Sequence, residues 1–201
     1  MIDEAVRVLH RGGVVAAATE SFFGLLADAT NARAVDRLLS LKPRGADKGQ
    51  PLLAPNVDVW AGLVLDVPPL AARLAHAFWP GGLTLVLPVR PGAVDERVTL
   101  DGTVAVRVPG ASPARALVEA FGRPLTATSA NSPGEPPART VLDVSSYFPA
   151  AVERGELTVL PGVAPGGAVS TIVVVSGDDY RVVRSGAVSA DQVQSALAAG
   201  T

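Results

Sequence analysis

The chain contains no cysteine, and this absence excludes several kinds of chemistry. Without cysteine there can be no disulfide and no thiolate nucleophile or thiolate metal ligand. Only two histidines occur, His10 and His76, and they lie far apart in the sequence. A histidine-based metal site or a serine–histidine catalytic triad is therefore not expected. The lack of cysteine also fits a reducing compartment.

Long apolar runs and strong net charge are also missing. No stretch approaches the roughly 20 apolar residues that a membrane-spanning helix needs. The first residues, Met1-Ile2-Asp3-Glu4, are acidic where a secretory signal would carry positive charge. The net charge is −2, so general adhesion to nucleic acid is not expected and any basic site must be local. We expect a globular, cytoplasmic protein that makes no membrane contact.

Helical and strand patterns alternate along the 201 residues. Capping residues and apolar residues at helical spacing predict helices that begin near Ile2, Asn31, Pro68, Ser112, Thr140 and Ser189. Apolar and β-branched runs predict strands at 14–18, 51–54, 83–88, 103–108, 124–127, 157–160, 172–175 and 180–184. We find no internal repeat and no linker-like change in composition. This order predicts one α/β domain over residues 1–201, built on a mixed β-sheet and flanking helices.

A basic segment stands between the second predicted helix and the next strand. Lys42, Arg44 and Lys48 place three cations within seven residues, and Gly45 and Gly49 allow tight turns there. A planar guanidinium group and two ammonium groups on a short loop suit a polyanion such as a nucleotide triphosphate. A solvated surface loop is the alternative, and the segment taken alone favours it.

Polar side chains follow two of the predicted strands. Thr19, Glu20 and Ser21 come directly after the strand at 14–18, and Ser129 and Asn131 come after the strand at 124–127. Hydroxyl and amide groups at strand ends can line a crevice and donate to phosphate or ribose oxygens. They can equally form turns that satisfy the local backbone.

One cation stands inside an apolar strand. Arg107 interrupts the run Thr103 to Val108, which is otherwise apolar and β-branched. A charge in such a strand needs a partner. The partner is either an internal carboxylate or a bound anion, and the pattern does not distinguish the two.

Seven blocks in a fixed order make the chain resemble the YrdC-type threonylcarbamoyl-AMP synthase family over nearly its whole length. The first three are Thr-Glu-Ser-Phe-Phe-Gly-Leu at 19–25, the pair Lys42 and Arg44, and Trp-Pro-Gly-Gly-Leu-Thr at 79–84. The next two are Thr-Val-Ala-Val-Arg-Val-Pro at 103–109 and Ala-Thr-Ser-Ala-Asn-Ser-Pro-Gly-Glu-Pro-Pro at 127–137. The last two are Val-Ser-Thr-Ile-Val at 169–173 and Arg-Ser-Gly-Ala at 184–187.

The resemblance implies both a fold and a reaction. The fold is a strongly twisted mixed sheet with a positively charged concave cavity, in the short form that holds only the catalytic domain. In the reaction, L-threonine, bicarbonate and ATP give threonylcarbamoyl-AMP and pyrophosphate. Other tRNA-modifying enzymes then transfer the threonylcarbamoyl group to tRNA, and weak binding of tRNA itself is conceivable on the same fold.

The resemblance also implies roles for single residues. Lys42 and Arg44 would be catalytic through charge neutralisation, because adenylation needs little acid–base help. The set that would bind ATP comprises Arg44, Lys48, Thr103, Ser129, Asn131 and Arg184. The set that would bind L-threonine comprises Ser21, Arg107 and Ser170. Mg²⁺ would arrive with the nucleotide, and no protein side chain is expected to ligate it.

Several residues differ from the usual family pattern, and those at positions 18, 23 and 55 motivate the first of two alternatives. Ala18 replaces a proline and Phe23 replaces a tyrosine. Pro55 or Ala54 stands where a histidine is common, and Val169, before Ser170, stands where proline or glutamate is common. One alternative is a related enzyme that acts on another carbamate or carbamoyl substrate. The other is a non-catalytic RNA-binding module, against which the net charge of −2 argues.

Overall fold

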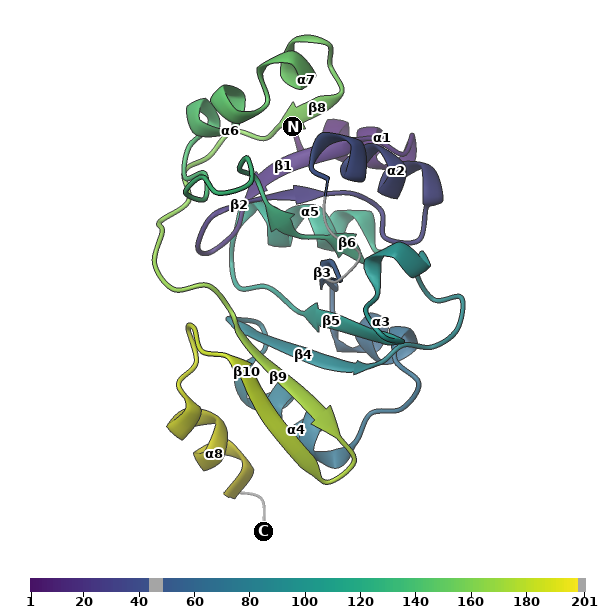
Figure 1. Ribbon diagram of the computed structural model, residues 1–201, viewed down its shortest axis with the longest axis vertical. Coiled ribbons are helices and arrows are strands. Elements are labelled where there is room, and N and C mark those ends of the chain that lie inside the picture. Colours follow the sequence, from purple (N-terminus) through teal and green to yellow (C-terminus); the bar gives the residue numbers. More distant parts are fainter. Residues whose placement is uncertain (44–48, 199–201) are drawn as a thin grey trace.

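The structure is a computed structural model, which describes residues 1–43 and 49–198 (Figure 1). The described helices are α1 Ile2–His10, α2 Ala32–Leu41, α3 Val57–Leu63, α4 Pro69–Phe78, α5 Pro113–Phe121, α6 Val141–Tyr147, α7 Pro149–Glu153 and α8 Ala190–Ala198. The described strands are β1 Val14–Ala18, β2 Phe23–Leu26, β3 Pro51–Leu53, β4 Leu83–Pro88, β5 Thr103–Arg107, β6 Leu125–Thr126, β7 Thr128–Ser129, β8 Leu157–Val159, β9 Thr171–Ser176 and β10 Asp179–Arg184. The α/β class is therefore confirmed.

The described strands form two mixed sheets. The upper sheet has the order β7-β2-β1-β8, and the lower sheet has the order β10-β9-β4-β5-β3-β6 (Figure 1). In the upper sheet β1 runs parallel to β8 and antiparallel to β2. In the lower sheet β4 runs parallel to β9 and antiparallel to β5. Both sheets are thus mixed, as the sequence predicts.

The two sheets are joined next to β6. The backbone N–H of Thr126 donates to Ala27 O at 2.9 Å, and Ala27 N donates to the Thr126 hydroxyl at 2.9 Å. The same hydroxyl is 3.3 Å from Leu25 O in β2. The Thr126 hydroxyl thus replaces one backbone acceptor of the strand pairing at this point. The strands therefore form two sheets, whereas the family resemblance implies one strongly twisted sheet.

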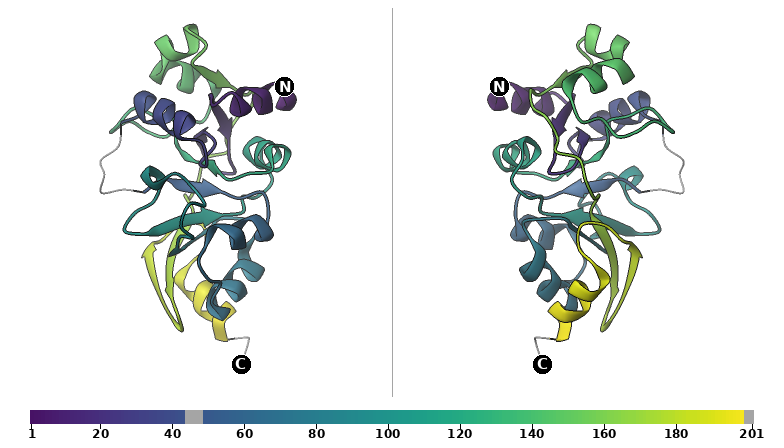
Figure 2. Two further views of the ribbon diagram at one scale, coloured as in Figure 1. Left: turned by 90° about the vertical axis from the view of Figure 1, so that its right-hand side faces the viewer. Right: turned by 90° about the vertical axis from the view of Figure 1, so that its left-hand side faces the viewer.

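In the described part of the chain, helices cover one face of the lower sheet. Side views place α3, α4 and α8 together on one side of β9 and β10 (Figure 2). The largest apolar core joins these helices to the sheet through residues such as Trp60, Leu74, Leu85, Val173 and Val193. The opposite face carries both polar and apolar side chains, among them Thr84, Arg107 and Ile172.

The predicted helix starts at Asn31, Ser112 and Thr140 are confirmed by side-chain caps. The side chains of Asn31 and Ser112 accept hydrogen bonds from backbone N–H groups in the first turns of α2 and α5. At α6, Thr140 and Asp143 form a reciprocal capping box, and the N–H groups of Arg139 and Thr140 hold the pKa of Asp143 below its ordinary value. The sequence analysis did not anticipate β2, β7 or α7.

A long segment connects β8 of the upper sheet to β9 of the lower sheet. Hydrogen bonds hold this segment to the turn before β2 and to the residues before α6. Gly166 N donates to Ser21 O at 2.8 Å, and the Arg139 guanidinium donates to Pro165 O at 2.7 Å. The segment therefore delivers Ser170 to a defined place beside the start of β4. Nowhere among residues 1–43 and 49–198 is there a helix with the length and hydrophobicity to cross a bilayer.

Candidate active site

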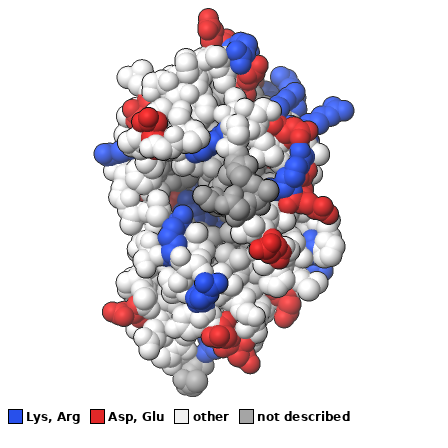
Figure 3. All heavy atoms as spheres, viewed as in Figure 1, with Lys and Arg blue, Asp and Glu red and all other residues white. Residues whose placement is uncertain are grey.

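A pocket of about 490 Å³ lies between the two sheets. Its lining residues come from both sheets and from the segments that connect them: Thr19, Ser21, Phe22, Phe23, Gly24, Lys42, Pro43, Pro51, Thr84, Arg107, Ala127, Thr128, Ser129, Pro133, Pro137, Val169, Ser170, Ile172 and Arg184. Among these described lining residues there are three cations and no carboxylate. Figure 3 shows Lys and Arg side chains around the hollow in the middle of the molecule.

Strand alternation builds the lower wall of the pocket. Leu83 and Leu85 of β4 point into the apolar core, so Thr84 between them points the other way and lines the pocket. The same alternation places Arg107 of β5 and Ile172 of β9 on the pocket side. One face of the lower sheet is thus core and the other is binding surface.

Lys42 ties α2 to the upper sheet. Its Nζ donates to Ser129 O at 2.6 Å, to Ser129 Oγ at 3.1 Å and to Asn131 Oδ1 at 2.8 Å. Asn131 is held in turn, because its amide donates to Glu135 O. The lysine that follows α2 therefore has a fixed direction, with its charge at the pocket wall.

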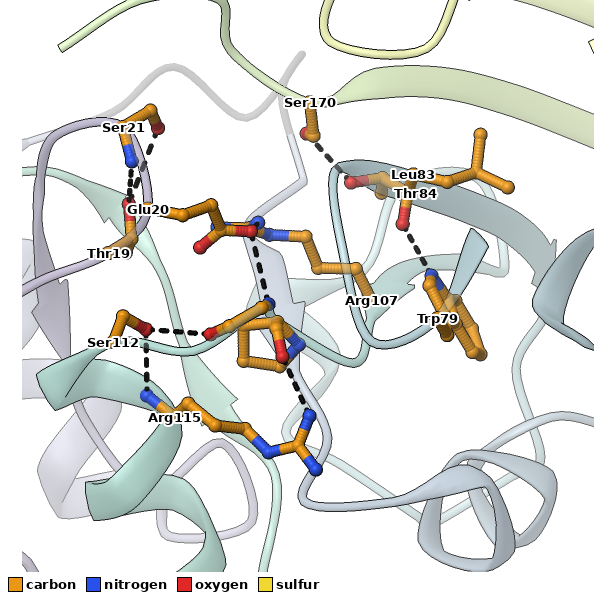
Figure 4. A network of polar contacts seen from close by, with 12 residues as sticks. Thr19, Glu20, Ser21, Trp79, Leu83, Thr84, Arg107, Ser112, Arg115 and Ser170 are labelled. Carbon is orange, nitrogen blue, oxygen red and sulfur yellow. Dashed lines mark hydrogen bonds and ion pairs between the residues drawn. The ribbon is translucent and has the colours of Figure 1, made fainter. Parts of the chain in front are cut away.

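Arg107 pairs with an internal carboxylate. Its guanidinium donates to Glu20, and Gly110 N lies 3.3 Å from the same carboxylate oxygen (Figure 4). The side chains of Arg107 and Glu20 are only 11% and 27% exposed, so the pair is partly withdrawn from solvent. Of the two partners that the sequence allowed, the structure contains the carboxylate. Arg107 also lines the pocket.

Ser170 is the centre of a second polar cluster. Thr84 Oγ1 donates to Ser170 Oγ at 2.8 Å (Figure 4). Arg184 donates to the same oxygen at 2.9 Å. Arg184 also donates to Ser170 O at 2.8 Å. A side chain at Gly186 would meet Val169 O at 2.1 Å, so this glycine allows the chain to approach the backbone before Ser170 closely.

Thr19 and Ser21 form the turn before β2. The Thr19 hydroxyl donates to Phe22 O at 2.8 Å and lies 3.2 Å from Ser21 N. The turn presents Ser21 to the pocket, where its hydroxyl lies 3.3 Å from that of Thr19. Both readings of this polar run thus apply, since it forms a turn and also lines the crevice.

Most of the predicted site residues converge on this pocket. Six of them line it: Ser21, Lys42, Arg107, Ser129, Ser170 and Arg184. Asn131 is not among the lining residues, but its Oδ1 accepts a hydrogen bond from Lys42 Nζ. Thr103 is not among the lining residues; it lies at the far end of β5 from Arg107, and its hydroxyl donates to Leu100 O. Arg44 and Lys48 lie outside the described residues.

Sequence reasoning did not single out Thr84 or Glu20. Thr84 is a buried hydroxyl in a strand of otherwise apolar residues, and that interruption was an available signal. Glu20 stood in the polar run after β1, but nothing local identified Arg107, 87 residues away, as its partner. Within residues 1–43 and 49–198 there is no group of three acidic or histidine side chains that could hold a metal ion.

The fold and the pocket define a class of α/β protein with two mixed sheets and, between them, a pocket whose described lining includes Lys42, Arg107 and Arg184. The Sua5_yciO_yrdC family, described as "Telomere recombination", matches residues 7–186. The chain therefore belongs to the Sua5/YciO/YrdC family.

Named relatives support the same membership. A threonylcarbamoyl-AMP synthase from Idiomarina loihiensis is 40% identical over 154 residues, which cover 75% of this chain and 82% of the relative. Another from Pseudomonas fluorescens (strain Pf-5) is 36% identical over 184 residues, covering 91% and 96%. P. abyssi Sua5, solved in complex with L-threonine, superimposes with a TM-score of 0.88 at 31% identity; the match covers 97% of this chain and 56% of the Sua5 chain.

Proposed function

We propose that this protein is an L-threonylcarbamoyladenylate synthase. It would combine L-threonine and bicarbonate to a carbamate, with loss of water. A carbamate oxygen would then attack the α-phosphorus of ATP and displace pyrophosphate. The similarity to enzymes named threonylcarbamoyl-AMP synthase supports this activity. The enzyme would work in the cytoplasm and pass its product to tRNA-modifying enzymes.

One structural observation carries the proposal. A single pocket brings together Lys42 on one wall and Arg107 with Ser170 on another, although these residues are widely separated in the sequence. A cation beside hydroxyl and amide groups suits phosphate, and a second cation beside a serine suits a carboxylate. Two anionic groups could therefore be held in one cavity and aligned for reaction.

ATP would occupy the wall made by Lys42. Its ammonium group is directed by Ser129 and Asn131, so part of the orientation needed for phosphate is already present. Arg44, Lys48, Thr103 and Arg184 would make the other nucleotide contacts. Charge neutralisation of the triphosphate is the catalytic contribution that we assign to Lys42 and Arg44.

L-threonine would occupy the wall made by Ser21, Arg107 and Ser170. Arg107 would bind the amino-acid carboxylate, and Ser21 and Ser170 would donate or accept hydrogen bonds around it. The complex of P. abyssi Sua5 with L-threonine supports the choice of amino acid. Phe23 lines the same pocket with an apolar ring, which gives that wall no hydroxyl.

Mg²⁺ would come with ATP and be held mainly by phosphate oxygens and water. The donor set fits that arrangement, because the described lining residues offer hydroxyls and cations but no carboxylate. When bound, the ion would neutralise part of the triphosphate charge. The protein's own residues would position the nucleotide and the amino acid around it.

Pyrophosphate release tests the proposal. Purified protein is mixed with ATP, Mg²⁺ and bicarbonate, and each amino acid is added in turn. We expect release that requires both L-threonine and bicarbonate. Release that requires a different amino acid would support the alternative of a related enzyme with another substrate, and tRNA binding without any release would support an RNA-binding module.

A further inference from the structure

The hydrogen bonds around Ser170 determine which way its hydroxyl can act. A serine oxygen has two lone pairs and one proton. Thr84 donates to this oxygen at 2.8 Å and Arg184 donates to it at 2.9 Å, so both lone pairs are in use. The proton of Ser170 remains, and its oxygen lines the pocket. Ser170 can therefore only donate to a ligand.

Thr84 is the residue that enforces this direction. It is 2% exposed, lies within β4 and makes its side-chain hydrogen bond to Ser170. Because Thr84 is buried in a regular strand, its hydroxyl has little freedom to move away. Without this bond one lone pair of Ser170 would be free, and Ser170 could accept as well as donate.

The order of strands in the lower sheet brings Ser170 close to Arg107. Leu85 of β4 pairs with Val106 of β5, so the next step of the antiparallel ladder sets Thr84 beside Arg107 on the pocket face. Ser170 and Arg107 thus stand on either side of Thr84. Both line the same pocket, where the Ser170 proton lies beside the Arg107 guanidinium, which also donates to Glu20. A hydroxyl donor beside a guanidinium suits an anionic oxygen pair such as a carboxylate.

We propose that Thr84 is a positioning residue that holds the Ser170 hydroxyl as an obligate donor to the carboxylate of the amino-acid substrate. The identity of that substrate rests on the proposed function. The Thr84 hydroxyl donates to Ser170, so Thr84 would act on the amino acid through Ser170. Its removal should therefore weaken amino-acid binding and leave the chemical step and ATP binding nearly unchanged.

Two substitutions test the proposal in the pyrophosphate assay. Thr84→Val keeps shape and strand preference but removes the hydroxyl, and we expect the KM for L-threonine to rise about tenfold with kcat and the KM for ATP nearly unchanged. Thr84→Ser restores a hydroxyl and should recover most of the affinity. Thr158→Val in β8 is the matched control, since Thr158 is not in the pocket lining. An increase confined to the KM for ATP, or no change, would overturn the proposal.

A second measurement does not depend on synthase activity. Acetate carries only the carboxylate, and its binding is followed by NMR shifts of the Ser170 and Thr171 amides. We expect saturable shifts in the wild type, weaker binding in Thr84→Val and recovery in Thr84→Ser. If the enzyme assay fails but this pattern holds, the proposed function is wrong and the role of Thr84 stands. Equal acetate binding in all three proteins, or none in the wild type, would refute that role.

Discussion

At the scale of single residues, Lys42 has the most consequential position. Its ammonium group donates to three oxygens, from Ser129 and Asn131, at the pocket wall. Ser129 lies in β7, which pairs with β2, and Asn131 follows β7 by two residues. The lysine is therefore both a structural link and the described cation best placed to meet a phosphate.

Replacing Lys42 should separate activity from folding. In Lys42→Met the aliphatic stem remains but the charge is lost, so we expect kcat/KM for pyrophosphate release to fall about 100-fold or more. Arg33→Met, on the exposed side of the same helix, should retain full activity. Steady-state kinetics of both variants, with circular dichroism to verify folding, is the measurement. Wild-type kinetics in Lys42→Met would remove Lys42 from the site.

The Glu20–Arg107 pair should contribute measurably to stability. Glu20→Gln leaves the guanidinium of Arg107 in a partly buried place without its counter-charge, and we expect a loss of about 1–2 kcal/mol. Glu119→Gln removes an exposed i,i+4 partner of Arg115 and should cost less than about 0.5 kcal/mol. Urea unfolding of both variants gives the comparison. Equal losses would mean that the inner pair is no stronger than a surface pair.

At the scale of single elements, the start of α6 predicts a dependence of stability on pH. The N–H groups of Arg139 and Thr140 lower the pKa of Asp143 in the folded state. A carboxyl group with a lowered folded pKa adds stability above its unfolded pKa of about 3.9, and this stability is lost as pH falls through the folded pKa.

Asp143→Asn should therefore lower the Tm at pH 7 by a few degrees, with the difference shrinking below about pH 4. Asp58→Asn is the matched control, because Asp58 lies in the first turn of α3 but Asn56 already caps that helix. Thermal unfolding followed by circular dichroism between pH 7 and pH 3 gives the result. A constant difference between Asp143→Asn and the wild type at all pH values would contradict the prediction.

At the scale of the whole molecule, Thr126 links the two sheets. Its hydroxyl accepts from Ala27 N and lies within hydrogen-bonding distance of Leu25 O, in a fully buried position. Thr126→Val preserves the shape but leaves these backbone groups without their partner. We expect a loss of about 1–3 kcal/mol.

The same substitution should loosen the junction locally. Amide hydrogen exchange near Ala27 should accelerate more than exchange in the core of β4, because the missing bonds lie between the sheets. Thr158→Val, in β8, should leave both stability and exchange close to the wild type. A uniform acceleration across both sheets would show that the junction does not open separately.

Local signals allowed much of the fold to be predicted. The caps at Asn31, Ser112 and Thr140 each depend on contacts within a few residues, and each is present. The missed strand β2 follows a tight turn, where Phe23 and Gly24 obscured the strand pattern. The missed helix α7 is only five residues long and begins directly after α6. Short elements like these obtain their stability from packing, which the local sequence does not display.

The sequence alone determined the alternation of most helices and strands, the capped helix starts, the lack of thiol chemistry and the polar blocks at the strand ends. These properties follow from side-chain type and from contacts between near neighbours. Only the tertiary structure decided that Arg107 pairs with Glu20 and that Thr84 directs Ser170, across 87 and 86 residues of chain. Such pairings depend on strand order and on which face of a sheet each residue occupies, and both are set when the whole chain packs.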